Sequence, residues 1–145
     1  MRLMKTEKVT VTVPSIFGYE EVVVEAVGTI ARVWKFPFDK VSKLKVAVAE
    51  ACINAIEHGN QKDPDKDVKV TIVCSDDAID VSVKDSGDGE VDPTFEMIDL
   101  REQIKQKKIG QWGLHLMRSL VDDIKIDAEA GEGTTTTVTI FKIRS

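Results

Sequence analysis

The chain is poor in cysteine and has no long apolar run. Its 145 residues include only two cysteines, Cys52 and Cys74, and no CxxC pair. Each cysteine lies within an apolar stretch, so we expect two buried thiols rather than a zinc site or a secreted disulfide framework. No apolar run approaches the roughly 20 residues that span a bilayer. The charged segment 1–8 also lacks the apolar centre of a signal peptide. We therefore expect a cytoplasmic protein with no membrane partner.

An excess of basic charge is also missing. The 20 lysines and arginines are scattered and are outnumbered by 25 acidic residues, which gives a net charge of −5. Binding to nucleic acid depends on clustered basic residues that displace counterions from phosphates, so we expect no nucleic-acid partner. The pattern GxxxxGK[ST] is absent as well, which excludes a P-loop as the phosphate site.

What remains is the composition of an ordinary folded protein. Hydrophobic residues make up 42% of the chain and charged residues 31%, too apolar a mixture for intrinsic disorder. The length suits one domain with its own core. The sequence contains no internal repeat, low-complexity tract or linker, so we expect a single domain over residues 1–145.

The order of the predicted elements indicates the fold class. Alternating residues predict strands at 8–13, 68–74 and 79–84. Two further strands are predicted at 124–128 and at 134–143, the latter rich in β-branched residues. Helical spacing predicts one helix that begins at Ile16, capped by Ser15, and ends before Phe36. It predicts further helices at 40–58, between Asp39 as N-cap and Gly59 as stop, and at 110–121. Because strands adjoin strands, we expect an α+β two-layer sandwich, with a mixed, mostly antiparallel sheet and helices on one face.

Three polar residues are spaced to share one face of the second predicted helix. Glu50, Asn54 and Glu57 lie at positions i, i+4 and i+7. A solvent-facing polar stripe explains this spacing simply. No cation lies three or four residues from Glu50, however, and a buried carboxylate or amide is costly without a partner. The alternative is a catalytic and metal site, because Asn and Glu offer the hard oxygen ligands that Mg²⁺ accepts.

Two glycine-rich segments are candidates for ligand contact. Asp85-Ser86-Gly87-Asp88-Gly89 follows a predicted strand. It is either a plain turn or a loop in which Asp85 accepts a hydrogen bond from an exocyclic amine while the glycines admit the ligand. Gly110-Gln111-Trp112-Gly113 opens a predicted helix. It either redirects the chain or binds a phosphate at the helix N-terminus. Gly131-Glu132-Gly133-Thr134-Thr135 is most simply a hairpin turn.

Taken together and in this order, the motifs resemble those of the GHKL ATPase family, which has the Bergerat fold. The resemblance consists of Glu-x-x-x-Asn on a helix, Asp-x-Gly-x-Gly after a hairpin, a glycine-rich helix start, and Gly-Thr before a strand. It covers roughly residues 41–140. Within that family, the stand-alone length and the stretch 47–59 look most like the anti-sigma-factor serine/threonine kinases.

The resemblance implies a function and a set of cofactors. An anti-sigma-factor kinase uses ATP and Mg²⁺, phosphorylates a serine on a small antagonist protein, and binds a sigma factor. Glu50 would be the general base that activates the serine hydroxyl, and Asn54 would coordinate Mg²⁺. The resemblance also implies a homodimer, for which the apolar segment 10–34 would supply a surface.

The remaining implied residues surround the nucleotide. Asp85 would accept a hydrogen bond from the adenine amine. Trp112 is either a packing residue or, from its place in the glycine-rich segment, a residue that faces the ligand. The others would shape the adenine pocket (Gly87, Gly89), flank the phosphate loop (Gly110, Gly113) or support the adenine site (Thr135).

The chain departs from the family pattern around the phosphate loop. Gln111 stands where adjacent glycines are frequent, and Lys105, Lys107 and Lys108 precede Gly110 where an arginine is more usual; Arg101 is further away. These departures keep an alternative open, in which the chain binds ATP as a regulatory module for a protein partner without transferring phosphate.

Overall fold

The computed structural model describes residues 5–87 and 109–143; of residues 109–112 it describes only the course of the backbone. The sheet has five strands in the order β1-β2-β3-β5-β4. Every neighbouring pair is antiparallel. The sequence predicted a mixed, mostly antiparallel sheet, and the described residues form no parallel pair. The strands are β1 (Glu7–Pro14), β2 (Asp67–Cys74), β3 (Ala78–Lys84), β4 (Asp123–Glu129) and β5 (Gly133–Phe141).

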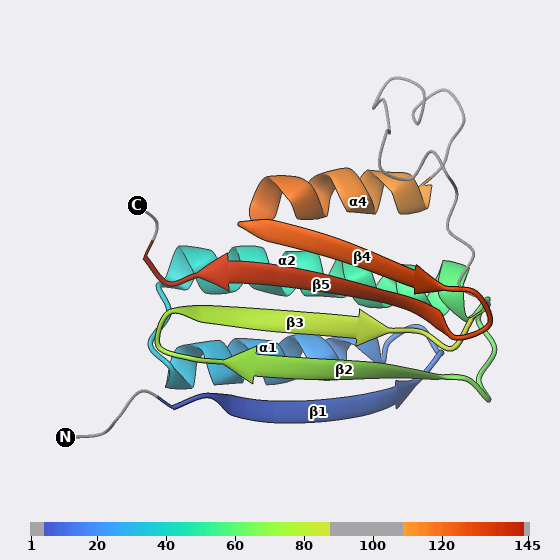
Figure 1. The fold of residues 1–145 in the computed structure, drawn as a ribbon, viewed down its shortest axis with the longest axis horizontal. Coiled ribbons are helices and arrows are strands. Elements are labelled where there is room, and N and C mark those ends of the chain that lie inside the picture. Colours follow the sequence, from blue (N-terminus) through green and yellow to red (C-terminus); the bar gives the residue numbers. More distant parts are fainter. Residues whose placement is uncertain (1–4, 88–108, 144–145) are drawn as a thin grey trace.

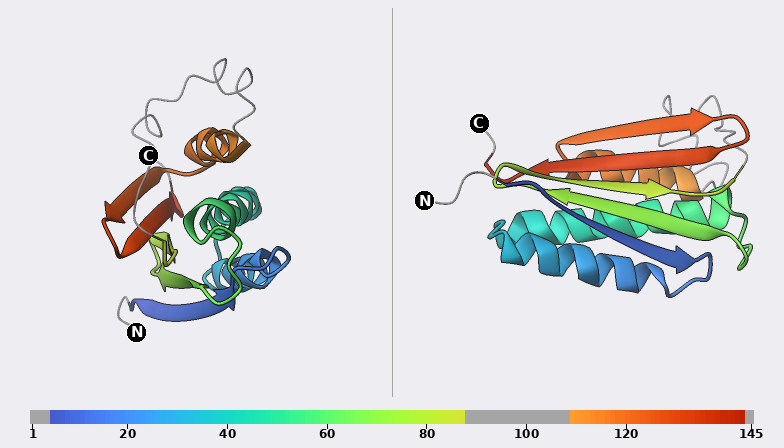
Figure 2. Two further views of the ribbon diagram at one scale, coloured as in Figure 1. Left: turned by 90° about the vertical axis from the view of Figure 1, so that its right-hand side faces the viewer. Right: turned by 60° about the horizontal axis from the view of Figure 1, so that its bottom comes forward.

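The helices form a second layer on one face of this sheet. They are α1 (Glu20–Val33), α2 (Phe38–Asn54) and α4 (Ile109–Leu120); α2 continues directly into a π-helical turn, η1 (Ala55–Gly59). Figure 1 shows the sheet in front of α1 and α2, and the left view of Figure 2 shows the two layers edge-on. The predicted α+β two-layer sandwich is confirmed.

The core lies between the two layers and follows the strand alternation. The inward positions of β3, at Ile79, Val81 and Val83, are almost fully buried against Leu44 and Val48 of α2 and their neighbours. Both cysteines are buried and free, as predicted. Burial is the main cause that raises the pKa of each thiol to about 12, so neither is a reactive thiolate at neutral pH.

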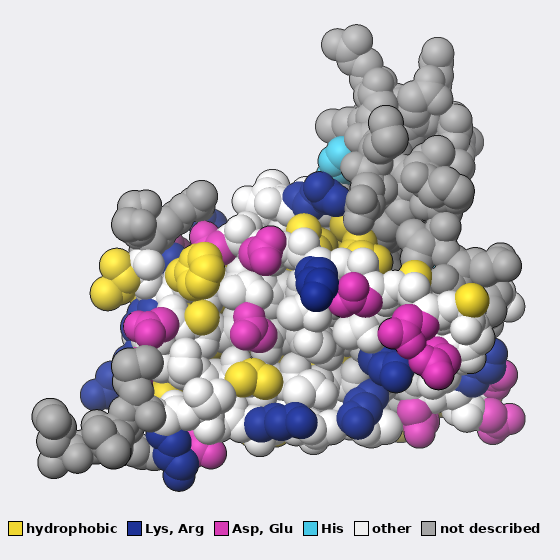
Figure 3. Space-filling model, in the orientation of Figure 1, with side chains coloured by type: hydrophobic (Ala, Val, Ile, Leu, Met, Phe, Trp, Pro, Cys, Tyr) yellow, Lys and Arg dark blue, Asp and Glu magenta, His cyan; other side chains and the backbone are white. Residues whose placement is uncertain are grey.

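The other face of the sheet is polar and faces solvent. Hydroxyl-bearing side chains pair across it: Ser82 Oγ lies 2.9 Å from Thr137 Oγ1, and Thr139 Oγ1 donates to Asp80 Oδ1 at 2.5 Å. Figure 3 looks onto this face and shows charges of both signs interspersed with uncharged surface. In β5, therefore, the positions Thr137 and Thr139 point away from the helices, and those next to them point toward the helices.

Two predicted helix caps were wrong. α1 begins at Glu20 rather than Ile16, because Gly18 has a φ of 107° and interrupts a helical path from Ile16; the Ser15 hydroxyl instead donates to the Lys66 carbonyl at 2.6 Å. α2 begins at Phe38, so Asp39 lies in the first turn rather than at the N-cap. An acidic side chain there still favours the helix through the dipole.

The layout brings three segments to one end of the molecule. α2 and η1 run toward the end where β3 finishes, and α4 returns alongside α2 in the opposite direction (Figure 1). The end of α2, the loop after β3 and the first turns of α4 meet there, away from the start of β1. None of the helices within residues 5–87 and 109–143 has the length and hydropathy that a bilayer crossing requires.

Candidate functional site

The second half of α2 packs against the first turns of α4. Glu50 and Asn54 are both partly buried, one helical turn apart. A Cβ added to Gly113 of α4 would lie 2.5 Å from Glu50 Oε2 and 3.5 Å from Asn54 Nδ2. The structure therefore brings together Glu50, Asn54 and Gly113, three residues that the sequence motifs singled out. Only a residue without a side chain fits at Gly113 without moving the carboxylate.

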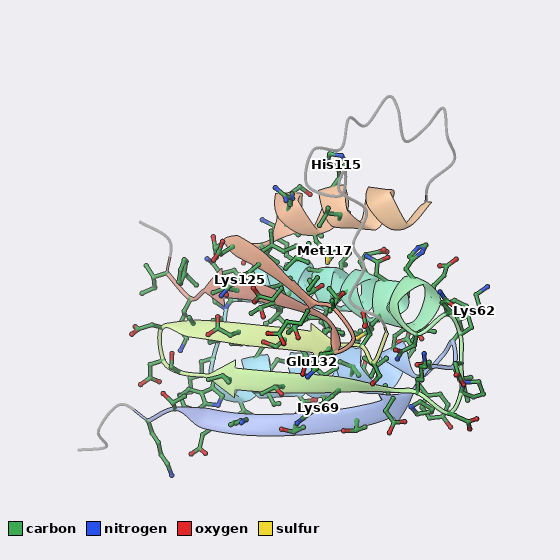
Figure 4. The ribbon with its side chains drawn as sticks, turned by 45° about the vertical axis from the view of Figure 1, so that its right-hand side comes forward. Lys62, Lys69, His115, Met117, Lys125 and Glu132 are labelled. Carbon is green, nitrogen blue, oxygen red and sulfur yellow. The ribbon has the colours of Figure 1, made fainter. Side chains whose placement is uncertain are left out.

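The amphipathic character of α4 sets this approach. Leu114 and Met117 are almost fully buried, and Figure 4 shows Met117 directed from α4 toward α2 and the sheet, whereas His115 lies on the opposite side of the helix. The apolar face of α4 therefore fixes its rotation about its own axis. That rotation presents the backbone of Gly113 to Glu50 and Asn54.

The environment of Glu50 makes its carboxyl group harder to ionise than in water. Burial raises the pKa of Glu50 above its ordinary value. Within the described residues, no hydrogen bond or ion pair compensates the charge of this side chain. A carboxylate whose pKa is raised toward neutrality is suited to accept a proton during a reaction.

The carboxylate of Asp85 is oriented by the main chain. Asp85 is only 6% exposed, and its Oδ1 accepts hydrogen bonds from the Gly87 amide at 2.9 Å and the Thr134 amide at 3.1 Å. Its own amide donates to the Thr134 carbonyl at 3.0 Å. Oδ1 is thus satisfied by backbone donors, which leaves Oδ2, in the described part of the chain, as the oxygen available to a ligand amine.

The end of η1 closes against Asp85. A Cβ on Gly59 would overlap Asp85 Oδ2, and a Cβ on Gly87 would overlap the Gly59 carbonyl oxygen. Gly59 was predicted only as the helix stop. It does end η1, but it also admits the Asp85 carboxylate, a role that sequence reasoning missed because a helix-ending glycine already had a sufficient explanation.

The structure does not bring Thr135 to this site. Thr135 has the same strand parity as Thr137 and Thr139, which makes it a position of the outer face, paired with Lys84. Thr134 instead contacts Asp85 through its amide and carbonyl. In β5 it is therefore Thr134, rather than Thr135, that is hydrogen-bonded to Asp85, and the predicted role of Thr135 stays a prediction.

Three other predicted residues lie at or beyond the limits of the described structure. Gly89 lies outside the described residues, as does the side chain of Trp112. Gly110 lies within α4, which begins at Ile109. Gly110 and Gly113 thus both lie in the helix predicted over 110–121, and their implied place beside a phosphate loop stays a prediction.

Comparison with known proteins decides the family. The family model described as "Histidine kinase-like ATPase domain" matches residues 18–140. The chain belongs to this family. ATP binding follows from that membership, and the GHKL resemblance seen in the motifs is confirmed.

Two of the similar proteins are serine-protein kinases. The chain is 28% identical over 124 residues to the serine-protein kinase RsbW of Bacillus subtilis, covering 82% of this chain and 77% of the relative. It is 27% identical over 133 residues to the RsbW of Listeria monocytogenes, covering 86% and 82% respectively. These names support the prediction of a GHKL-type serine/threonine kinase.

A solved structure agrees on the fold. The chain resembles a crystal structure of the RsbU and RsbW domains of a Mycobacterium tuberculosis protein, with a TM-score of 0.67 at 20% identity. The match covers 92% of this chain but only 32% of that one. It shows the fold alone.

Proposed function

We propose that this protein is an ATP-dependent serine kinase that acts as an anti-sigma factor. It phosphorylates a serine of a small antagonist protein and binds a sigma factor. The observation that carries the proposal is the juxtaposition of the partly buried Glu50 carboxylate with Asn54 and with Gly113 of α4; Glu50 and Asn54 lie on the helical run whose end contacts Asp85. The similarity to RsbW kinases supports the choice of protein substrate and partner.

The order of residues along α2 and η1 supports one orientation for ATP. Gly59 lies at the Asp85 end, Asn54 lies five residues earlier, and Glu50 four residues before that. At 1.5 Å per residue, Glu50 and Gly59 are separated by about 13 Å along the axis. ATP running antiparallel to the helix places its adenine at Asp85 Oδ2, its phosphates beside Asn54, and its γ-phosphate toward Glu50.

This orientation gives each residue a chemical task. The serine oxygen of the substrate forms a bond to the γ-phosphorus as the bond from that phosphorus to the β–γ bridging oxygen breaks, and ADP departs with the electron pair. The hydroxyl proton passes to the Glu50 carboxylate, whose raised pKa suits it to receive one. Positioning of the two reactants supplies most of the remaining acceleration.

The residues present fit a magnesium ion bound mainly through the nucleotide. The described residues contain no group of three or more His, Cys, Asp or Glu side chains that would hold a metal by themselves. Asn54 offers one amide oxygen beside the proposed phosphates, and Mg²⁺ commonly uses one or two protein ligands with water and phosphate oxygens. When bound, the ion would neutralise phosphate charge, and Asn54 would hold it.

Phosphate transfer from radiolabelled ATP to a purified antagonist protein tests the proposal. We expect the wild-type chain to label one serine of the antagonist and Glu50→Gln to label none. Glu57→Gln is the matched control, because Glu57 is also partly buried and lies two turns further along the same helical run. Absence of a labelled serine, with ATP demonstrably bound to the wild type, would refute the kinase activity and leave a regulatory ATP-binding module.

The partner surface and the homodimer belong to the same proposal. Large apolar side chains stand exposed at the junction of β1 and α1, namely Ile16, Phe17, Tyr19 and Val22. Such a patch is typical of a contact surface and lies within the segment 10–34 named from the sequence. Sedimentation of the wild type and of Phe17→Ser tests it: a dimer weakened by the substitution supports this surface, and an unchanged dimer excludes it.

A further inference from the structure

Asn60, immediately after η1, is a buried amide to which the proposed function gives no task. Its side chain is 0% exposed, and an amide is costly to bury unless its hydrogen bonds are made. Asn60 Nδ2 donates to Ser15 Oγ at 2.7 Å and to the Asp67 carbonyl at 3.1 Å. Its Oδ1 accepts from the Ser86 amide at 2.7 Å. One side chain therefore joins the end of β1, the start of β2 and the loop after β3.

The bond to Ser86 acts directly on Asp85. The Ser86 nitrogen belongs to the peptide group that follows Asp85, so its hydrogen bond fixes the orientation of that peptide. Asp85 is anchored on its other side by Thr134, whose carbonyl accepts from the Asp85 amide. Asn60 and Thr134 thus hold the backbone of Asp85 from two directions, and the carboxylate direction follows from the backbone they fix.

The chain around Asn60 adopts unfavourable backbone conformations to reach this position. Gln61 has φ 51° and Lys62 has φ 59°, both left-handed although neither residue is glycine. The Asn60 amide donates to the Ala55 carbonyl at 2.8 Å, and the Lys62 amide to the Ile56 carbonyl at 2.7 Å, which closes the π-type end of the helix. Figure 4 shows Lys62 at the tip of the loop that follows η1. Such conformations persist only where the surroundings enforce them, and they cluster at functional sites.

We propose that Asn60 is a positioning residue for base recognition: through Ser86 it sets the direction of the Asp85 carboxylate and so controls selection of the adenine amine. The inference rests on the proposed contact between Asp85 and adenine. Asn60 does not touch the nucleotide. Its contribution is a fixed acceptor position, obtained before ATP arrives, which reduces the cost of ordering the loop on binding.

The test compares ATP with purine riboside triphosphate, which lacks the exocyclic amine. Calorimetry on the full chain gives the ratio of the two dissociation constants. We expect the wild type to favour ATP and Asn60→Ala to reduce that preference about tenfold, the effect of weakening one charge-assisted hydrogen bond. Ser15→Ala is the control, because it removes another buried partner of Asn60 and leaves the Ser86 bond in place. It should lower thermal stability without changing the ratio.

A conservative pair keeps the test decisive if Asn60→Ala does not fold. Asn60→Asp retains the acceptor for the Ser86 amide and should keep the preference for ATP, whereas Asn60→Ser is too short to reach and should lose it. An unchanged ratio in Asn60→Ser or Asn60→Ala, with discrimination intact in the wild type, overturns the role of Asn60 alone. An equal loss in Ser15→Ala does the same, since it would reflect general loosening. A wild type that binds both nucleotides equally refutes the contact between Asp85 and adenine, and the inference with it.

Discussion

The two ends of the proposed nucleotide site differ in how their polar groups are satisfied. At the base end, Asp85 and Asn60 are buried, and backbone groups from β2, β5 and the loop after β3 hydrogen-bond to Asp85 Oδ1 and to the Asn60 amide. At the phosphate end, Glu50 is partly buried, its pKa is raised, and the described residues offer its carboxylate no compensating partner. In the described part of the chain, one end is held by hydrogen bonds before ATP binds, and the other has a carboxylate with no such bond.

This difference separates recognition from chemistry. A hydrogen-bonded network fixes an acceptor in one direction, which suits the reading of a base. An uncompensated carboxylate is unfavourable for folding but available to take up a proton. If the comparison is correct, substitutions at the base end should change affinity, and substitutions at the phosphate end should change rate.

The largest expected effect is on the rate of phosphate transfer in Glu50→Gln. Removal of a general base typically costs about 10²–10⁴-fold in rate. The amide is nearly isosteric and lies far from Asp85, so the dissociation constant of ATP should stay within about twofold. Single-turnover transfer and calorimetry measure the two quantities. A variant that loses ATP binding and rate together would break the division between the two ends.

A smaller effect, confined to affinity, is expected for Asp85→Asn. The amide oxygen can still accept from Gly87 and Thr134, but an NH₂ group replaces Oδ2 and confronts the adenine amine with a second donor. Loss of one charge-assisted hydrogen bond corresponds to roughly 10- to 100-fold weaker ATP binding. Asp80→Asn, on the outer face of the sheet, is the control and should bind ATP normally. Undiminished ATP affinity in Asp85→Asn would mean that a group other than Asp85 binds the adenine amine.

Gly113→Ala should reduce the rate about tenfold without a large change in stability. Alanine favours a helix over glycine by about 1 kcal/mol, and the clash it creates is with the flexible end of Glu50, whose Oε2 lies 2.5 Å from the added Cβ. The gain in helix propensity and the clash with Glu50 have opposite effects on stability. The rate of phosphate transfer only falls, because the clash displaces the Glu50 carboxylate from its position.

Gly28→Ala is the matched control for this substitution. Gly28 is also helical, and its added Cβ would meet the aliphatic stem of Lys45 at 3.1 Å, so the rate of transfer should not change. Equal rates in Gly113→Ala and wild type would show that the exact position of Glu50 does not matter.

The sequence predicted the elements of the site better than their contacts. The stretch from Glu50 to Gly59 carries both a helical period and the polar spacing, so the helix and its polar face could be predicted from the sequence. Thr134 and Thr135 differ by strand parity, which the uniform run of threonines at 134–137 does not show. The register with β3 determines which of the two faces the helices.

Asn60 shows the other limit of sequence reasoning. A polar residue after a helix is ordinarily solvated, and its sequence neighbours Gln61 and Lys62 are exposed. Its partners lie 45 residues before it at Ser15 and 26 residues after it at Ser86. Only tertiary structure assembles them. The same reason explains the wrong prediction for Ser15. Its local pattern is that of a helix cap, but its hydroxyl is hydrogen-bonded to Lys66 and Asn60, which are distant in sequence.

The smallest expected effect is a gain in stability at neutral pH in Glu50→Gln. Because the folded-state pKa of Glu50 lies above its ordinary value of 4.5, both states hold the proton below about pH 4.5 and the carboxyl then costs nothing. As the pH rises through the interval up to the folded-state pKa, the unfolded chain releases its proton first, so the wild type loses stability that the glutamine variant keeps. Melting temperatures without nucleotide should therefore coincide near pH 4 and diverge in favour of Glu50→Gln by pH 7. A wild type more stable than Glu50→Gln at pH 7, with the gap closing in acid, would mean that a cation compensates Glu50 and that the phosphate end is as fully satisfied as the base end.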